Sequence, residues 1–177
     1  DKRPGQFKEY GNRAGSYSFV TPDLVRGTLA KGMDFYLSLD DAFARAAFMM
    51  FLVSEVHPFE DGNGRVARVM MNAELVARGQ HRLIVPTVYR NEYLDGLRAL
   101  SQNGNARPFV TVLDFAHRYT SAIPWSDFGV ARRVLEATNA FTRPKDADIS
   151  GLRLRMPTTD ILRRAEPDED GGGGEPR

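Results

Sequence analysis

The feature that most constrains the fold is a segment from Phe43 to Val56 that is apolar on nearly every side. Its exceptions are Arg45 and the pair Ser54-Glu55. A helix without a polar face is stable when other helices cover it at the centre of a bundle. His57-Pro58 ends the segment, because the residue before a proline avoids helical geometry. The sequence therefore predicts a helical bundle built around residues 43–56.

Other helices are indicated on both sides of this segment. Thr21-Pro22-Asp23 combines a hydroxyl cap, a proline and an acid, which predicts a helix that begins there and runs to Leu37. Ser38 or Asp40 is expected to cap the apolar helix. The next helix is expected to begin near Asn63 and to end at Arg78-Gly79. Further helical patterns lie at 90–102, 108–123, 127–141 and 158–165, with Pro108 and Ser126 at two of the starts.

The two ends of the chain have a different character. Near the N-terminus, Tyr17 and Phe19 alternate with small residues in a glycine-containing stretch, which predicts a short hairpin. Beyond Pro144 the helical signal weakens. Glu166–Arg177 holds five acids and four consecutive glycines, so we expect a flexible tail there. The expected fold class is all-α, with six or seven helices and a small N-terminal β-hairpin.

Composition removes several classes of function. The 177 residues suit one domain, and the absence of cysteine excludes disulfides, thiolate metal sites and a cysteine nucleophile. The longest apolar run has eight residues, against roughly 20 for a membrane-spanning helix. The N-terminus has no signal-peptide pattern, so the expected location is the cytoplasm. A net charge of +1 favours neither a nucleic-acid nor a membrane partner, although 20 of the 24 basic residues are arginine.

Residues His57–Arg68 (HPFEDGNGRVAR) hold an unusual concentration of reactive groups. Gly62 and Gly64 let the backbone bend and let a ligand approach closely as the chain enters a helix. The first turn of a helix exposes N–H groups and the positive dipole end, which bind phosphate. Arg65 and Arg68 share one helix face in this region, which is reasonable where an anion binds.

Two further groups in this segment suit phosphate chemistry. Asp61 offers a hard oxygen ligand for Mg²⁺, and His57 is a natural proton acceptor near pH 7. Taken singly, each group has a plainer interpretation: a helix-start acid, a capping or core histidine, and a solvated pair of arginines. Their combination within twelve residues favours a phosphate site. It is neither a Walker loop nor a dinucleotide-binding glycine motif.

At every specified position, this segment is similar to the H-P-F-x-[D/E]-G-N-G-R-x-x-R signature of the Fic family. The stretches Gly5–Lys8 and Phe19–Pro22 resemble the segments around the family's flap, and Arg90–Tyr93 and Arg107–Phe109 resemble its later helices. The resemblance covers about residues 4–125. It implies a Fic core over 1–143, with a flap at about 5–20 and a catalytic loop at 57–68. A C-terminal extension over 144–165 and a tail over 166–177 would follow.

The resemblance also implies an activity, namely transfer of AMP from ATP to a hydroxyl of a target protein with release of pyrophosphate. Its residue roles follow the motif. His57 would be the general base, Phe59 would anchor the loop in the core, and Asp61 would bind Mg²⁺. The anion hole and the phosphate contacts would come from Gly62, Asn63, Gly64, Arg65 and Arg68, with Arg68 on the γ-phosphate.

Several implied roles concern the adenine of ATP and the target protein. Tyr93 fits an adenine-stacking tyrosine, with a buried helix aromatic as the plainer alternative. Ser101, Gln102 and Asn103 compete for the position that faces adenine. The flap residues Gly15–Ser18, Ser16 and Tyr17 among them, would align a target protein as an added strand, unless they form only a surface hairpin. His81 and His117 lack motif partners and are interpreted as structural.

Three alternatives and one regulatory question remain at this point. The chain could use another donor such as UTP or CDP-choline, could remove AMP, or could be a catalytically silent nucleotide-binding module. The inhibitory pattern [S/T]-x-x-x-E-[G/N] of many Fic proteins is absent, because no glutamate has Ser or Thr four residues earlier. We therefore expect Arg68 to be free for phosphate and this chain to be active alone. The inhibitory glutamate would come from a separate protein or from a missing N-terminal helix.

Overall fold

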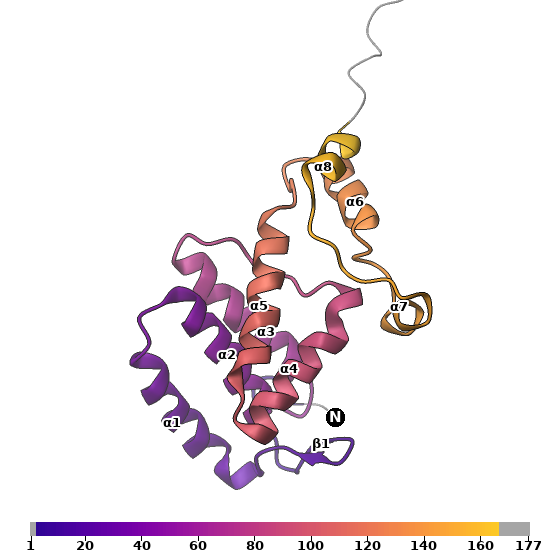
Figure 1. Ribbon diagram of the computed structural model, residues 1–177. Helices are drawn as coiled ribbons and strands as arrows, with labels where there is room; N and C mark the ends of the chain where they lie inside the picture. Colours follow the sequence, from indigo (N-terminus) through magenta and orange to yellow (C-terminus); the bar gives the residue numbers. More distant parts are fainter. Residues whose placement is uncertain (1–2, 167–177) are drawn as a thin grey trace, which may run out of the picture.

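Helices dominate residues 3–166, which are the residues that the computed structural model describes (Figure 1). A single antiparallel hairpin precedes them, with Arg13 opposite Ser18 and Ala14 opposite Tyr17. The all-α class with a small N-terminal hairpin is therefore confirmed. Most of the expected tail, 167–177, lies outside the described residues. The elements are β1 Arg13–Ala14, β2 Tyr17–Ser18, α1 Val25–Leu37, α2 Ala42–Val56, α3 Asn63–Ala77, α4 Arg90–Asn103, α5 Ala106–Ser121, α6 Phe128–Ala137, α7 Pro144–Ser150 and α8 Thr159–Ala165, with 3₁₀ turns at Pro22–Leu24 and Thr87–Tyr89.

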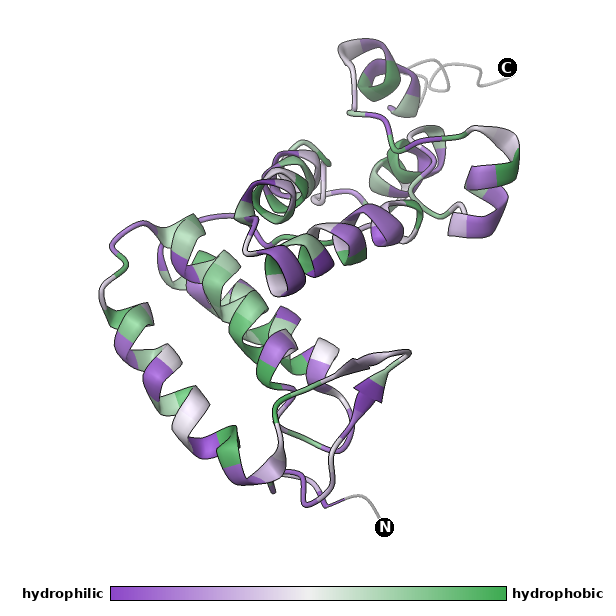
Figure 2. Cartoon of the chain, turned by 60° about the horizontal axis from the view of Figure 1, so that its bottom comes forward, coloured by the Kyte–Doolittle hydropathy of each residue, from purple (hydrophilic) through white to green (hydrophobic). Residues whose placement is uncertain are grey.

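The apolar helix α2 is the centre of the molecule, as its composition predicts. One of its faces packs against α1 through Met49, Leu52 and Val56. The opposite face, which includes Met50 and Val53, belongs to the core that α3, α4 and α5 share. Figure 2 shows the helix beside α1 in the colour of hydrophobic residues along most of its length. Burial on two sides explains why the segment has no polar face.

The single basic residue inside α2 has partners on both neighbouring helices. Arg45 donates to the Glu74 carboxylate of α3 at 3.2 Å and lies 3.9 Å above the Tyr36 ring of α1. The Tyr36 hydroxyl donates to the same carboxylate at 2.6 Å. Because the guanidinium is paired and hydrogen-bonded, its charge is accommodated in the interior and ties α1, α2 and α3 together.

A second core lies beyond the middle of α5. Tyr119, Val130, Val134 and Ala165 are buried there together, so that α6 and α8 cover the C-terminal end of α5. The Tyr119 and Thr138 hydroxyls are hydrogen-bonded at 2.6 Å within this core. Figure 1 shows this C-terminal layer on the side of the molecule away from the hairpin. Among residues 3–166, no helix combines the length and the apolar composition needed to cross a membrane.

Several helix starts differ from the expected positions, because a nearby side chain caps better. Asp41, rather than Ser38 or Asp40, accepts the Ala44 N–H at the start of α2. Asn105 caps α5, which therefore begins two residues before Pro108. Asp127, rather than Ser126, caps α6. In the first turn of a helix, a proline loses no helical hydrogen bond, so Pro108 is tolerated inside α5.

The C-terminal helices also differ in number from the expectation. The described residues hold eight α-helices, because α7 forms directly after Arg143, where the sequence signal is weak. Pro144 occupies its first position, which suits the fixed φ of proline. The helix expected at 158–165 is confirmed as α8, with the Thr158 hydroxyl accepting the Ile161 N–H. The expected helix over 127–141 ends earlier, at Ala137.

The packing of α4 on α5 leads to a stability prediction at Gly96. A Cβ on Gly96 would lie 3.0 Å from the Phe109 Cα and 3.2 Å from the Pro108 carbonyl carbon, and this backbone cannot yield as a side chain can. Alanine should raise helix propensity by about 1 kcal/mol, whereas overpacking costs roughly 1–3 kcal/mol. We expect Gly96→Ala to lower the free energy of unfolding, measured by urea denaturation.

The matched control is Gly27→Ala in α1, where nothing lies within 4 Å of the added methyl group. That variant should keep or raise the free energy of unfolding. If Gly96→Ala were stabilised as much as Gly27→Ala, the close approach of α4 and α5 would be contradicted.

Candidate active site

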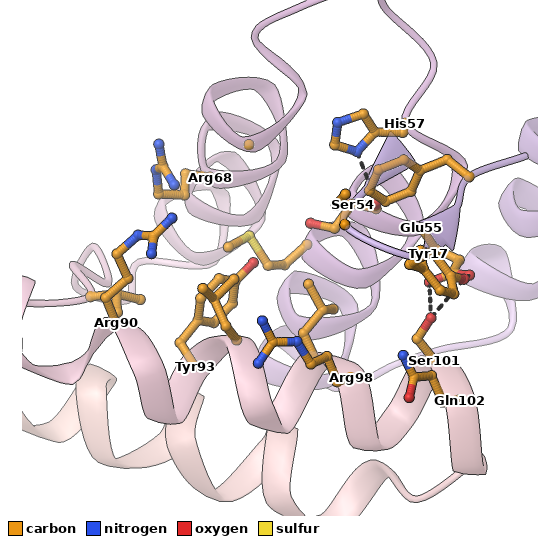
Figure 3. Close-up of a pocket in the computed structure, with 18 of the residues that line it drawn as sticks. Tyr17, Ser54, Glu55, His57, Arg68, Arg90, Tyr93, Arg98, Ser101 and Gln102 are labelled. Carbon is orange, nitrogen blue, oxygen red and sulfur yellow. Dashed lines mark hydrogen bonds between the residues drawn. The ribbon is translucent and has the colours of Figure 1, made fainter. Parts of the chain in front are cut away.

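A cleft of about 980 Å³ lies between the hairpin, the end of α2, the start of α3 and the face of α4. Figure 3 shows its side chains in three groups. Arg68 and Arg90 stand at one end, and Tyr17, Glu55 and Ser101 meet at the other. His57 lies on the side opposite α4. The cleft therefore has a cationic end and a hydrogen-bonding end, with an imidazole along its edge.

His57 occupies the residue position that ends α2. Its φ of 49° and ψ of 57° are left-handed, while its N–H still donates to the Val53 carbonyl. The ring Nδ1 lies 3.1 Å from the Ser54 carbonyl oxygen. Because a carbonyl only accepts, Nδ1 carries the hydrogen and Nε2 keeps its lone pair. Phe19 stacks on the ring at 3.8 Å between centroids, so the imidazole is held as a base with one available nitrogen.

The surroundings of His57 keep it neutral at physiological pH. Burial of the ring lowers the pKa of His57 below its ordinary value, and the nearby Lys8 cation lowers it further. The hydrogen bond to the Ser54 carbonyl opposes them by favouring the charged ring. Burial is the largest of the three effects, so the neutral form needed to accept a proton dominates at pH 7.

The loop from α2 to α3 is shaped by Asn63. Its side chain is buried, accepts the Phe59 N–H at 2.8 Å and donates to the Phe59 carbonyl at 2.8 Å. Gly62 has a φ of 82°, which favours glycine, and the Asp61 carboxylate accepts its N–H at 2.7 Å. Phe59 itself is half-buried and packs against Phe7 of the N-terminal segment, with 5.9 Å between ring centroids. It therefore anchors the loop to the segment before the hairpin.

The charged residues of the predicted phosphate site divide into two groups. Arg68 points into the cleft, where Arg90 from α4 reaches the same end (Figure 3). Arg65 and Asp61 lie on the outer side of the loop, 3.7 Å apart, with side chains 75% and 50% exposed. Arg98 of α4 also lines the cleft. Three guanidinium groups therefore line the cleft, and an anion is the ligand that suits them.

A hydrogen-bonded group fastens the hairpin at the other end of the cleft. The Tyr17 hydroxyl of β2 donates to the Glu55 carboxylate at the end of α2. The Ser101 hydroxyl of α4 lies 2.5 Å from the same carboxylate and 2.8 Å from the Tyr17 oxygen. Burial and the Glu55 carboxylate raise the pKa of Tyr17, so its hydroxyl stays protonated and donates. Glu55 therefore links the hairpin, α2 and α4.

The cleft brings together many, though not all, of the residues predicted from the sequence. The residues that line it are Ser16, Tyr17, His57, Gly64, Arg68, Tyr93, Ser101 and Gln102. Those that do not line it are Asp61, Gly62, Asn63, Arg65 and Asn103. Tyr93 is only 8% exposed and packs against Phe109, so it forms part of the floor and does not project into the cleft. Of the three candidates to face adenine, Ser101 and Gln102 border the cleft and Asn103 does not.

Sequence reasoning missed three charged residues that line the cleft, Glu55, Arg90 and Arg98. Glu55 could have been found, because it interrupts an otherwise apolar helix two residues before His57. Arg90 lies at the start of α4 within the stretch already noted for its resemblance to a later helix. Arg98 follows eight residues later on the same helix, about two turns along, which places both arginines on one face. The approach of Arg90 to Arg68 depends on how α3 and α4 lie across the cleft from each other, which local sequence patterns do not predict.

The carboxylates of the described residues do not gather into a metal centre. Within residues 3–166 no group of three or more His, Asp or Glu side chains is arranged to hold a metal ion. Asp61 is a single carboxylate at the edge of the glycine-containing loop. Mg²⁺ commonly binds proteins through one or two carboxylates together with substrate phosphates. By its chemistry this one carboxylate fits Mg²⁺ carried by a phosphate ligand, while its side chain lies on the outer side of the loop near Arg65.

Comparison with known proteins points to one family. Residues 1–75 match the model of the Fic/DOC family. A protein adenylyltransferase Fic of Drosophila yakuba is 42% identical over 65 residues, which cover 37% of this chain and 13% of that protein. The structure of Fic-1 (residues 134–508) from C. elegans is 30% identical with a TM-score of 0.55, covering 64% of this chain and 34% of that one.

A Fic family protein from Desulfovibrio desulfuricans G20 extends the structural likeness along the chain. Its crystal structure has a TM-score of 0.56 and covers 93% of this chain and 55% of the other, at 20% identity. That likeness shows the fold alone. The chain spans only a small part of the length of the Drosophila relative that it matches. The family model covers the hairpin, α1, α2 and all but the end of α3.

The environment of His57 predicts where its ring titrates. The pKa of His57 should lie below the ordinary 6.5, because burial disfavours the charged ring. In the folded protein the His57 ring is therefore protonated at a lower pH than an ordinary histidine. Any activity that needs the neutral ring should persist at pH 6.5. NMR titration of the histidine ring signals, with His57 assigned from the spectrum of His57→Gln, measures this value. A midpoint above 6.5 would contradict the arrangement described.

Proposed function

We propose that this chain, which belongs to the Fic/DOC family, is a protein adenylyltransferase that moves AMP from ATP to a hydroxyl of a target protein. One observation carries the proposal: His57 presents a free Nε2 at the edge of a cleft whose other side holds Arg68 at a helix N-terminus. A base and an anion site within one cleft are what nucleotidyl transfer to a hydroxyl requires.

The proposed reaction is a substitution at the α-phosphorus of ATP. The target hydroxyl gives its proton to Nε2 of His57 while its oxygen forms a bond to the α-phosphorus. The bond from that phosphorus to the bridging oxygen of pyrophosphate breaks, and pyrophosphate leaves with the electron pair. His57 then releases the proton to solvent. The products are an AMP ester of the target and pyrophosphate, so atoms and charge balance.

Charge neutralisation at the leaving group supplies the remaining catalysis. Gly64 and Arg68 of α3 line the end of the cleft that would hold the β- and γ-phosphates, next to the N-terminus of that helix. Arg90 adds a second guanidinium at that end. Asp61 would hold Mg²⁺, which supplies further charge neutralisation when it is bound with the nucleotide. Arg65, on the outer side of the loop, would reach the phosphates by turning from Asp61.

The hydrogen-bonding end of the cleft is assigned to the nucleoside. Tyr93 and Leu97 give this part an apolar floor, and Ser101 and Gln102 border it with groups that hydrogen-bond to a base. Those groups suit adenine and also other bases, so UTP or a CDP-linked donor is the second candidate. The glycines at 62 and 64 retain the tight loop, which argues against a silent interaction module.

The hairpin is assigned to the target protein. β1 and β2 are two residues each, and apart from Tyr17 their residues are exposed, so a strand edge is available for an extended segment of a target. Phe19 on His57 and Tyr17 on Glu55 fix the hairpin beside the proposed base. An extended segment added to this edge would bring its hydroxyl near Nε2. Regulation by a glutamate from a separate protein, or from a preceding helix, would act at Arg68.

The primary test is an intact-mass measurement of the purified chain after incubation with Mg-ATP, alone and with lysate proteins. We expect addition of one AMP to the chain or to a target, and a loss of about 10²–10⁴-fold in rate for His57→Ala. His81→Ala, which changes an exposed histidine outside the cleft, is the control and should label at the wild-type rate. No labelling of any protein by the wild-type chain, with ATP or another nucleotide, would refute the proposal.

A second test concerns the γ-phosphate. Arg68→Ala should weaken binding of ATP more than binding of ADP, because only ATP carries the phosphate assigned to this side chain. A lost charged hydrogen bond of roughly 1.5–3 kcal/mol predicts about a 10- to 150-fold loss for ATP. Calorimetric titration of both nucleotides measures the difference. Arg118→Ala, an exposed arginine of α5 paired with Asp114, is the control. Equal losses for ATP and ADP would remove Arg68 from the γ-phosphate.

A further inference from the structure

Lys8 is a buried lysine that the proposed chemistry does not use. It lies five residues before β1 and is only 3% exposed. Its Nζ donates to the Asn12 side-chain oxygen at 2.7 Å and to the Val56 carbonyl at 3.2 Å. Burial is the one effect that shifts the pKa of Lys8, and it lowers that pKa. Among residues 3–166, no carboxylate forms an ion pair with the Lys8 ammonium group. A buried cation without a counter-ion is costly, so its position calls for an explanation.

The side-chain ammonium and the backbone N–H of Lys8 bind the backbone on both sides of His57. Its Nζ reaches the carbonyl of Val56, the residue before His57, and its own N–H donates to the carbonyl of Pro58, the residue after it, at 2.8 Å. Asn12, which accepts from Lys8, donates to the next carbonyl, that of Phe59, at 3.0 Å. Lys8 and Asn12 together therefore bind three of the four carbonyls from residue 56 to residue 59.

The backbone at His57 needs such support. A left-handed φ on a residue other than glycine costs on the order of 1–3 kcal/mol unless its surroundings fix it. The C-terminus of α2 also concentrates partial negative charge on its last carbonyls, where a cation is favourable. Lys8 supplies the cation and the second donor at one place. Because φ and ψ at residue 57 orient its Cα–Cβ bond relative to the preceding and the following backbone, the backbone contacts on both sides and the direction of Nε2 are linked.

We propose that Lys8 is a positioning residue for His57, and that its clamp on the carbonyls of Val56 and Pro58 directs Nε2 of His57 into the cleft. The proposal rests on the proposed function, in which Nε2 accepts the proton of the target hydroxyl. Lys8 touches neither the cleft nor its ligand, so it acts through the backbone. The stretch Gly5–Lys8, noted in the sequence without a role, would thereby contribute to the chemistry.

The charge of Lys8 has a second effect on the same ring. It is the charged side chain that lowers the pKa of His57, adding to the effect of burial. The other charged groups of the cleft are engaged elsewhere. Glu55 binds Tyr17 and Ser101, Arg98 pairs with Asp95 of its own helix, and Arg68 and Arg90 stand at the far end. On the hairpin side His57 meets the uncharged Phe19 ring. Removal of the Lys8 charge should therefore raise the pKa of His57.

The test compares Lys8→Met and Lys8→Arg in the full chain. Lys8→Met should lower the rate of AMP labelling about 10- to 100-fold at saturating Mg-ATP, while the Kd for ATP stays within about twofold of wild type, since the clamp touches no phosphate. Lys8→Arg should restore most of the rate, because it returns a cation to the Val56 carbonyl. Lys31→Met, an exposed lysine of α1, is the control and should match wild type. A wild-type rate in Lys8→Met would overturn the proposal.

Two further measurements distinguish a positioning role of Lys8 from a failure of the proposed function and from a merely structural role. In NMR titrations the midpoint of His57 should rise in Lys8→Met and not in Lys31→Met; an unchanged midpoint would count against the clamp. This readout needs no activity, so it tests Lys8 even if the wild-type chain labels nothing and the proposed function fails. If Lys8→Met does not fold, Asn12→Ala decides by the same rate and Kd criteria. Equal losses in rate and ATP affinity would show a merely structural role.

Discussion

The rest of the site depends on how the backbone between α2 and α3 is held. In these six residues the chain leaves one helix through a left-handed histidine and enters the next through a left-handed glycine. Such a turn cannot satisfy its carbonyls by helical hydrogen bonds, so donors must come from elsewhere. Asn63, the first residue of α3, supplies one donor. Lys8 and Asn12 supply others from the segment before the hairpin. The positions of His57 and of the α3 N-terminus both follow from these contacts.

The bundle makes that turn rigid. Because α2 is buried on two faces, its C-terminal end is fixed, and the loop begins from a defined point. α3 is joined to α2 along its length and through Arg45 and Glu74, so the helix N-terminus that ends the loop is fixed as well. α4 completes the cleft, and it is held against α5 by the close approach at Gly96. Helix packing thus determines the geometry to which the site residues are attached.

The local part of this arrangement could be predicted from the sequence, and the part made by distant contacts could not. His57-Pro58 and the glycines at 62 and 64 gave the helix end, the loop and the next helix, because each acts on its own backbone. The roles of Lys8 and Glu55 depend on partners 46 or 48 residues away, and periodicity carries no information about such pairs. The hydrogen bonds of the Asn63 side chain with the Phe59 backbone were likewise not predicted, and its place in the anion hole stays a prediction.

The distribution of charge in the cleft gives a direction to any nucleotide that enters it. Arg68 and Arg90 at one end attract phosphate, while the Glu55 carboxylate at the other end would repel it. Tyr17 and Ser101 satisfy that carboxylate, so it costs little while the hairpin is closed and becomes exposed if the hairpin opens. The acid therefore fastens the hairpin to α2 and α4, and in the proposed complex it would also disfavour phosphate at this end. His57 lies between the two ends, so in the proposed reaction it would meet the nucleotide where the phosphates join the nucleoside, at the α-phosphorus.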